Sequence, residues 1–308
     1  MTPELQNRPI AILGAGLIGL GWAALFAHHG AQVTLWDPSA DALAAVPDRI
    51  AKPLADLAML DERPARGQWR VTPDLAAAVA GAVLIQENAP ESMPLKHALY
   101  ADLEQVAPPE AILASSTSSL TWDDLAPGLR KPDRLITAHP FNPPHLVPLV
   151  ELYGPDPVRL DRAEVLYIAA GRVAVRLNRP ATGHIANRLA SALWREAVHI
   201  VADGIAEVEA VDRALMNGPG LRWSVLGAHM AYHLGGGSGG MTAYLDHLGP
   251  SQERRWDDLG APRLTPEVKS RLIDGVAKAS AGRDIATLEA ERDAALIALL
   301  QSRPKPQT

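Results

Sequence analysis

The chain has 308 residues, with 29 basic and 35 acidic side chains, so its formal net charge is −6. At roughly 100–200 residues per domain, this length suggests two domains. The acidic balance and the lack of a long basic run argue against nucleic acid or a membrane surface as the main partner. The chain has no cysteine, which excludes a disulfide framework and a thiolate metal site. Its polar first residues, Met1 to Arg8, lack a signal-peptide layout. We therefore expect a cytoplasmic protein and no bound metal.

The first part of the chain alternates between apolar runs that are typical of strands and stretches that are typical of helices. The expected strands are residues 10–13, 32–36, 82–86, 111–114, 134–138 and 172–179. One expected helix covers residues 20–29 and ends at Gly30. A second covers residues 41–59 and is interrupted by Pro47 and Pro53. This alternation predicts the α/β class, with a doubly wound parallel sheet over residues 1–180.

The sequence pattern of the second part of the chain predicts helices. Apolar residues recur at every fourth position from Ile185 to Val201, which predicts a helix over 184–203 that Gly204 ends. Thr265 followed by Pro266 is typical of a helix start, and a last helix is expected over 285–301. The glycine-rich segment 235–240 reads as a loop between helices. Residues 181–308 are thus expected to form an all-helical C-terminal domain.

Gly14, Gly16 and Gly19 follow the first expected strand and open the first expected helix. A glycine-rich turn alone can serve only to pack the chain, without binding a ligand. Here, however, Asp37 also stands at the end of the next expected strand. That context predicts a Rossmann-like domain that binds a dinucleotide, with the pyrophosphate on the helix N-terminus beside Leu17 and Ile18. A carboxylate at Asp37 would accept hydrogen bonds from a ribose hydroxyl and repel the phosphate of NADP, so the predicted cofactor is NAD.

Polar residues follow three of the expected strands, at 87–91, 115–119 and 139–142. Ligands of open α/β sheets bind beyond the carboxyl ends of the strands. Each cluster alone can be a turn, but all three fall at the same edge as the glycine loop. His139 is the strongest acid/base candidate there, since an imidazole exchanges protons near neutral pH. Glu151 ends another apolar run and could hold that imidazole in one tautomer.

Three longer motifs carry a resemblance to a known family. They are SSTSSL at 115–120, HPFNPPHLVPLVE at 139–151 and HIANRL at 184–189. In this order, over nearly the whole chain, they resemble the 3-hydroxyacyl-CoA dehydrogenase superfamily. QENAPE at 86–91, ALWREAVHIVADG at 192–204 and the segment 218–241 resemble a branch that acts on L-carnitine, and a branch that acts on L-gulonate is a close second.

The resemblance implies a role for several residues. His139 is the implied catalytic base and Glu151 its partner, while Ser118 and Asn187 contact the substrate. Further implied contacts of the cofactor are Glu91, Lys96, Ser118 and Asn142. The family usually has Pro-Gly-Phe where this chain has Thr182-Gly183-His184. This departure affects the expected shape of the part of the site that faces the substrate, not the expected chemistry. The resemblance also implies a homodimer formed through the helical domain.

The substrate expected from this resemblance is a small 3-hydroxy acid. A trimethylammonium group is typically held by aromatic faces, and the aromatic candidates are Phe141, Trp194, Trp223 and Tyr232, each of which can equally be core. Arg222 is a candidate carboxylate clamp, or else an ion pair at a surface or subunit interface. A CoA substrate is less expected, because residues 51–68 hold few basic residues: Lys52, Arg63 and Arg66. A protein that binds the nucleotide without turnover is the remaining alternative, and the intact set of Ser118, His139, Glu151 and Asn187 argues against it.

Overall fold

The structure is a computed structural model that describes residues 5–61 and 67–303. The chain divides into two compact units, one of residues 1–188 with 290–308 and one of residues 189–289. The sequence placed a single boundary near residue 180. In the structure the last helix, α14 (Ile285–Ser302), crosses from the second unit into the first, so the first unit is built from both ends of the chain.

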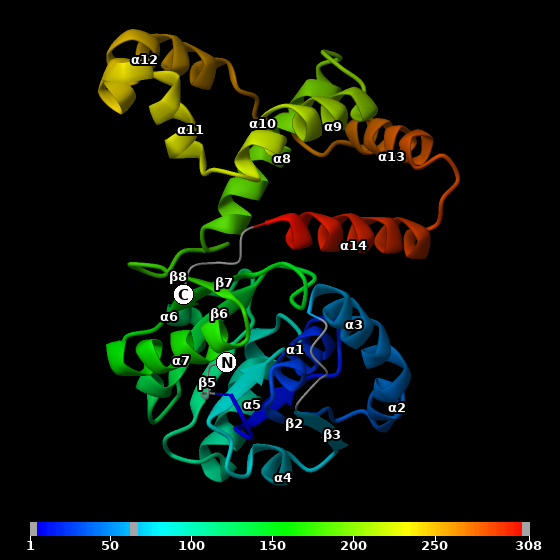
Figure 1. Cartoon of the computed structure of the whole chain (residues 1–308), viewed down its shortest axis with the longest axis vertical. Helices are drawn as coiled ribbons and strands as arrows, with labels where there is room; N and C mark the ends of the chain where they lie inside the picture. The colour runs from blue at the N-terminus through cyan, green and yellow to red at the C-terminus, as the bar shows by residue number, and fades with distance from the viewer. Residues whose placement is uncertain (1–4, 62–66, 304–308) are drawn as a thin grey trace. The chain divides into compact units, whose positions relative to one another are not determined.

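The first unit contains one eight-stranded sheet, in the order β3-β2-β1-β4-β5-β6-β7-β8 (Figure 1). The strands are β1 (Pro9–Leu13), β2 (Gln32–Trp36), β3 (Gln68–Thr72), β4 (Leu84–Glu87), β5 (Ile112–Ser115), β6 (Leu135–Pro140), β7 (Leu149–Tyr153) and β8 (Val173–Arg176). Strands β1 to β6 are parallel, whereas β7 is antiparallel to β6 and β8 is parallel to β7. The order reverses between β1 and β4, which makes their carboxyl ends the expected ligand crevice.

The helices fall into the same two units. Those of the first unit are α1 (Leu17–His28), α2 (Ala40–Ala44), α3 (Val46–Leu60), α4 (Leu75–Val79), α5 (Met93–Val106), α6 (Trp122–Leu125), the 3₁₀ turn η1 (Pro132–Arg134) and α7 (Pro157–Ala169). α8 (Ala186–Ala202) starts in the first unit and continues into the second. The second unit also has α9 (Val208–Asn217), α10 (Pro219–Trp223), α11 (Ala228–Gly235), the 3₁₀ turn η2 (Gly237–Gly239), α12 (Gly240–Asp258) and α13 (Pro266–Ser280).

Two hydrophobic cores cover the two faces of the sheet. Along β1, Ile10 and Ile12 point into a core shared with α1, α3 and α7, and Ala11 and Leu13 point into a core shared with α4, α5 and α6. Side chains of a strand alternate between its faces, so a strand buried on both faces is apolar throughout. This confirms the predicted doubly wound sheet.

Two local predictions differ from the structure. β3 was not predicted, because it is an edge strand whose side chains are exposed or half-buried and which lacks an apolar run. Pro53 was expected to interrupt a helix, yet α3 continues through it. Burial of Ile50 and Leu57 against the α1 core outweighs the backbone hydrogen bond that a proline removes. Pro47, as expected, marks a boundary, since it lies in the first turn of α3.

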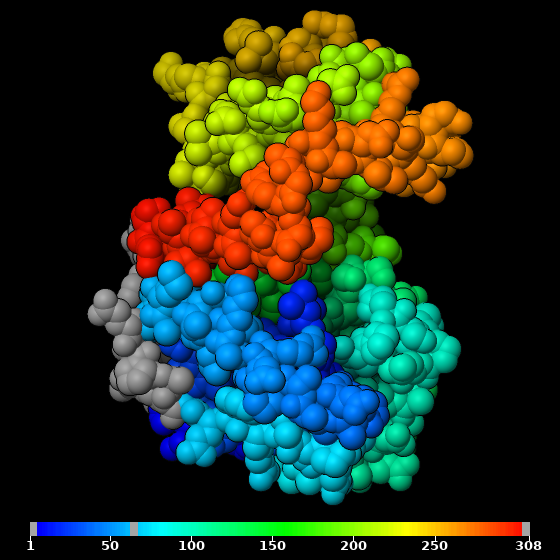
Figure 2. Space-filling view, turned by 90° about the vertical axis from the view of Figure 1, so that its right-hand side faces the viewer, coloured from blue at the N-terminus to red at the C-terminus, as the bar shows by residue number. Residues whose placement is uncertain are grey.

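The end of α14 packs against α3, and Figure 2 shows its red atoms against the blue atoms of α3. Lys52 Nζ lies 2.5 Å from Asp293 Oδ2, and Gln301 donates a 2.8 Å hydrogen bond to the carbonyl of Met59. Ile297, which lies between Asp293 and Gln301 in α14, is buried. Lys52, one of the three basic residues considered for CoA, is therefore committed to an ion pair. Arg63 and Arg66 lie outside the described residues.

The second unit leaves many large apolar side chains in solvent. Those at least half exposed include Met216, Leu221, Val225, Met230, Leu234, Trp256 and Ile273. The glycine-rich segment 235–240 is more ordered than the expected loop, because it forms η2 and the first residue of α12. Within 5–61 and 67–303, every helix is too short or too polar to span a bilayer.

Candidate active site

The glycine loop leaves an open path to the first turn of α1. Gly14 has φ +100°, and a Cβ there would lie 2.9 Å from the carbonyl oxygen of Asn88. A Cβ at Gly19 would lie 1.9 Å from the carbonyl oxygen of Gly14, so Gly19 allows helix and loop to touch. At Gly16, by contrast, no described atom lies within 4 Å of the point that a Cβ would occupy, and no side chain caps α1. The backbone N–H groups of Leu17 and Ile18 are thus placed as the fold places donors for a pyrophosphate.

Asp37 is anchored where β2 ends. Its Oδ2 accepts a hydrogen bond from the Ala15 N–H at 2.8 Å, and its Oδ1 accepts one from the Ser39 N–H at 2.9 Å. Each carboxylate oxygen keeps a second lone pair for a ribose hydroxyl. Together with the open backbone at Gly16, these residues fit the adenosine and pyrophosphate parts of NAD.

His139 and Glu151 face each other across the sheet. Because β7 runs antiparallel to β6, the two residues are direct cross-strand partners, and His139 Nδ1 lies 2.8 Å from Glu151 Oε2. A carboxylate only accepts, so Nδ1 carries the hydrogen and Nε2 keeps its lone pair when the ring is neutral. The amide nitrogen of Asn187 lies 3.4 Å from that Nε2. The structure therefore brings together three of the four predicted catalytic side chains.

Glu151 also links this pair to the start of α8. Its Oε1 accepts hydrogen bonds from the N–H groups of Ile185 and Ala186, at 2.8 and 2.9 Å. Burial by itself would raise the pKa of Glu151, but the hydrogen bonds from His139 and from these two amides outweigh it and lower the pKa. Glu151 is thus held as a carboxylate, the form that stabilises a protonated imidazole.

The loop that carries Ser118 is gathered around Glu91. One oxygen, Glu91 Oε1, accepts hydrogen bonds from the hydroxyls of Thr117 and Ser119 and from the N–H groups of Ser118, Ser119 and Leu120, at 2.7 to 3.3 Å. Burial opposes ionisation here too, yet these bonds lower the pKa of Glu91 to about 2. Glu91 therefore shapes the serine loop, and the Ser118 hydroxyl has no hydrogen-bond partner within the described part of the chain.

Lys96 is enclosed in a buried polar network rather than exposed to the crevice. Its Nζ lies 2.7 Å from Glu87 Oε1 and donates to the carbonyl of Ala89 at 3.1 Å. Glu87 Oε2 accepts hydrogen bonds from Tyr100 and Ser115, both at 2.7 Å. Lys96 Nζ also lies 3.8 Å from Glu91 Oε2. Its charge supports the strand ends beneath the serine loop.

The predicted substrate residues fall into both units. In the first, Phe141 is half-buried with its ring edge-on to His139, at 6.5 Å between centroids, and Asn142 beside it is exposed. In the second, Trp194 lies on α8, and Arg222 and Trp223 lie on α10; all three are exposed. Arg222 has no ion pair with any described residue. Tyr232 on α11 packs against Tyr244, with ring centroids 5.0 Å apart, which favours its alternative interpretation as core.

Sequence reasoning named His184 only as a departure from the family motif. In the structure His184 is buried, its ring stacks on that of His139 with centroids 4.7 Å apart, and its Nε2 lies 3.1 Å from the carbonyl of Thr117. Asn88 lies in the predicted polar cluster 87–91 but was given no role: its amide donates to the carbonyls of Leu13 and Gln86 and its oxygen accepts from the Ser116 hydroxyl. The motif departure was the one signal that pointed to His184.

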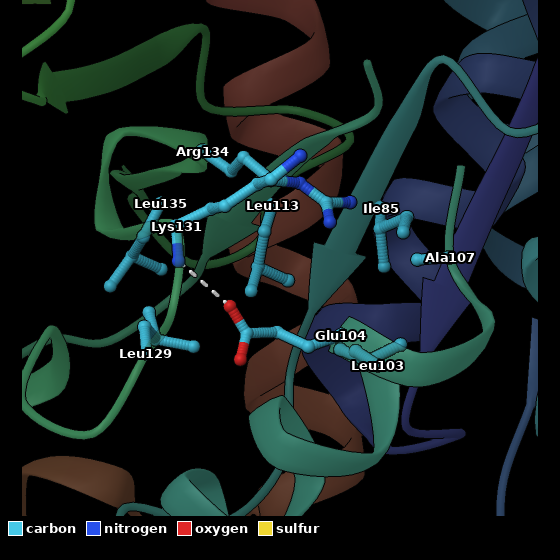
Figure 3. A pocket seen from close by; sticks show the side chains of 9 residues that line it. All are labelled: Ile85, Leu103, Glu104, Ala107, Leu113, Leu129, Lys131, Arg134 and Leu135. Carbon is cyan, nitrogen blue, oxygen red and sulfur yellow. Dashed lines mark hydrogen bonds between the residues drawn. The ribbon is translucent and has the colours of Figure 1, made fainter. Parts of the chain in front are cut away.

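A separate pocket lies at the amino ends of the strands, opposite the carboxyl ends at which the candidate site lies (Figure 3). It is bounded by Ile85, Leu113 and Leu135, which stand near the amino ends of β4, β5 and β6, and by Leu103 and Glu104 of α5. Glu104 Oε1 accepts a hydrogen bond from the backbone N–H of Lys131, seen as the dashed line in Figure 3. Its lining combines apolar side chains with Glu104, Lys131 and Arg134 and includes no histidine. Among the described residues, no cluster of three or more His, Asp or Glu side chains could hold a metal ion.

Comparisons with known proteins identify the family to which the chain is similar. The family model described as the NAD binding domain of 3-hydroxyacyl-CoA dehydrogenase matches residues 9–179, and the model of the C-terminal domain matches residues 183–262. The chain is 42% identical to an L-carnitine dehydrogenase of Nocardiopsis dassonvillei, over 98% of this chain and 93% of that protein. It is also 42% identical to one of Streptomyces griseus, over 98% and 91%. A solved structure of an NAD⁺-dependent 5-formyl-3-hydroxy-2-methylpyridine 4-carboxylic acid 5-dehydrogenase matches with a TM-score of 0.78 and 28% identity, over 97% of this chain and 100% of that one.

Proposed function

The chain belongs to the 3-hydroxyacyl-CoA dehydrogenase family, an NAD-dependent oxidoreductase family, and we propose that it oxidises the 3-hydroxyl of L-carnitine to 3-dehydrocarnitine. The observation that carries the chemistry is the contact of His139 with Glu151, which leaves the lone pair for a proton on His139 Nε2, 3.4 Å from the amide nitrogen of Asn187. The choice of L-carnitine is supported by relatives of that name at 42% identity over nearly the whole chain.

In this proposal Gly14, Gly16 and Asp37 would hold NAD, which would supply the acceptor for the hydride from carbon 3 of the substrate. His139 Nε2 takes the proton of the 3-hydroxyl, so the C–H and O–H bonds break as the carbonyl forms. A base of this kind contributes about 10²–10⁴-fold. Glu151 stabilises the protonated ring, and Asn187 with the free Ser118 hydroxyl donates hydrogen bonds to the substrate oxygen.

The substrate ends are assigned to the remaining polar and aromatic candidates. Arg222, exposed and without an ion pair among the described residues, would bind the carboxylate through its planar fork. Phe141, Trp194 and Trp223 would present ring faces to the trimethylammonium group. Tyr232 is the weakest of the aromatic candidates, since its ring already packs on Tyr244. Glu91, Lys96 and Asn142 would act near the nicotinamide, the first two by fixing the strand ends and the serine loop.

The domains divide this work in the proposal. Residues 1–180 bind NAD, and residues 181–308 bind substrate and form a homodimer, a role supported by the exposed apolar side chains of the second unit. The partner bound for turnover is a small molecule, and we propose a cytoplasmic location.

A substrate panel tests the proposal most simply. NADH formation is measured with L-carnitine, D-carnitine, L-gulonate, 3-hydroxybutyrate and 3-hydroxybutyryl-CoA, each with saturating NAD. We expect kcat/KM for L-carnitine to exceed every other substrate by at least tenfold. Preference for gulonate, 3-hydroxybutyrate or the CoA ester would keep the His139 chemistry but reject carnitine. Absence of NADH with all five would reject the enzyme assignment of this site.

A further inference from the structure

His184 occupies an unusual backbone position beside the active site. It lies between β8 and α8 with φ +49°, directly after Gly183 at φ +76°. A left-handed backbone is unfavourable for a residue with a Cβ, so surrounding contacts must hold it there. Two contacts do so: the stack on the His139 ring, with 25° between the ring planes, and the hydrogen bond between His184 Nε2 and the carbonyl of Thr117.

These contacts define the protonation state of His184. The Thr117 carbonyl only accepts, so Nε2 carries the hydrogen, and Nδ1 is a buried lone pair without a partner among the described residues. Burial is the largest effect on the pKa of His184 and lowers it, against the opposing hydrogen bond to the Thr117 carbonyl; His139 lowers it further, and Glu151 and Glu91 raise it. His184 is therefore a neutral aromatic ring when His139 takes up a proton.

The stack also connects the two halves of the catalytic edge. His139 and Glu151 stand on β6 and β7, whereas Ser118 stands on the loop that follows β5. Thr117, the residue before Ser118, bonds His184 through its carbonyl and Glu91 through its hydroxyl. His184 thus contacts both the base and the serine loop.

We propose that His184 is a positioning residue: its ring face fixes the plane of the His139 imidazole and offers a π surface to that imidazole when it is protonated, while its N–H fixes the serine loop. This rests on the proposed role of His139 as the base. A cation over an aromatic face gains about 0.5–2 kcal/mol, which corresponds to about 2- to 30-fold in rate. A purely space-filling residue at position 184 would not supply this.

The experiment compares three variants that distinguish the effect of an aromatic ring at position 184 from the effect of side-chain volume. His184→Phe keeps an aromatic face but loses the bond to Thr117. His184→Leu fills similar space without a ring, and His184→Asn lacks a ring but tolerates the left-handed backbone. The kcat and KM of each are measured with the substrate that the parent enzyme oxidises, together with the KM for NAD and the melting temperature.

We expect kcat of the Phe variant to stay within about threefold of the parent, and kcat of the Leu and Asn variants to fall about tenfold or more, with the KM for NAD unchanged. Equal kcat for the Phe variant and a folded ringless variant would overturn the proposal, as would parental kcat in the Leu or Asn variant. Because two ringless variants are used, loss of folding in one leaves the comparison with the other. A parent enzyme that oxidises none of the substrates would instead reject the proposed function.

Discussion

The two units of the chain differ in how far their side chains find contacts within the same unit. In the first unit, the carboxylates at the carboxyl edge of the sheet are partnered within the unit: Glu87 by Lys96, Glu91 by the serine loop and Glu151 by His139. In the second unit, apolar side chains such as Leu221 and Val225 stay more than 60% exposed. The difference teaches that the acid/base chemistry is assembled within one unit, whereas the helical unit leaves a set of large apolar side chains exposed, the feature on which the proposed homodimer rests.

The largest expected effect follows from removing the base in the first unit. His139→Gln should lower kcat by about 10³-fold, since glutamine cannot accept the substrate proton and general bases contribute about 10²–10⁴-fold. The dissociation constant for NAD should remain within a factor of two, because the glycine loop is untouched. His97→Gln, a matched change at a histidine that bonds the carbonyl of Asp124 and is not one of the predicted site residues, should retain parental kcat. Unchanged turnover in His139→Gln would contradict the assignment.

The next effect sharpens the claim that both chain ends build the first unit. Ile297→Ala should lower the free energy of unfolding by about 2–4 kcal/mol, because Ile297 is only 3% exposed in the part of α14 that belongs to the first unit. Leu299→Ala, two residues on and 41% exposed, should cost much less. Urea unfolding of both variants measures the two values. Equal, small losses would mean that α14 does not belong to the fold of the first unit.

A smaller effect tests the surface of the second unit. Burying a large aliphatic side chain contributes about 1.5–3 kcal/mol, so charges at Leu221 and Val225 should weaken a homodimer built on that surface. We expect the parent to be a dimer by light scattering at micromolar concentration and Leu221→Lys/Val225→Lys to shift towards monomer. Val158→Lys, at a 62% exposed position of α7 in the first unit, is the control and should stay dimeric. A monomeric parent would refute the proposed assembly.

The smallest effect concerns pH. Burial lowers the pKa of His29 to about 4 and also lowers the pKa of His145 and His184. Unfolded histidines take up protons near pH 6.5, so below that pH protonation favours the unfolded chain until the folded histidines titrate as well. For His29 the free energy of unfolding should fall by about 1 kcal/mol per pH unit between pH 7 and 5, and the lowered pKa values of His145 and His184 act in the same direction. Glu91 and Glu151 have lowered pKa values in the folded chain, so their ionised forms stabilise the fold above about pH 4.5. That stability is lost only as the pH falls below about 4.5.

Urea unfolding at pH 7, 6 and 5 measures this slope, and His29→Gln should flatten it. A free energy of unfolding that is constant over this range would contradict the proposed neutral state of the buried histidines.

Local patterns in the sequence were sufficient for the parts of the fold that depend on near neighbours. The glycine motif, the apolar runs of β1, β2, β4, β5 and β6 and the Thr265 cap were predicted within about two residues, because each depends on periodicity or on capping. β3 was missed because an exposed edge strand has no apolar run. The return of α14 to the first unit depends on Lys52 and Asp293, which lie 241 positions apart, a distance that no local pattern covers.

The candidate site divides in the same way. His139, Glu151 and Asn187 were named from the sequence, but their contact depends on the antiparallel register of β6 and β7 and on the start of α8. Neither appears in the spacing of residues. The stack of His184 on His139 likewise needs a left-handed turn whose direction the sequence does not specify.

The most direct test of the central claim follows the hydrogen that the enzyme removes. The protein is incubated with NAD and L-carnitine that carries deuterium at carbon 3, and the NADH is analysed by mass spectrometry. Direct hydride transfer at the His139 edge predicts NADH that is one mass unit heavier and a keto product that has lost the deuterium. Unlabelled NADH, or no reduction of NAD at all, would contradict the account.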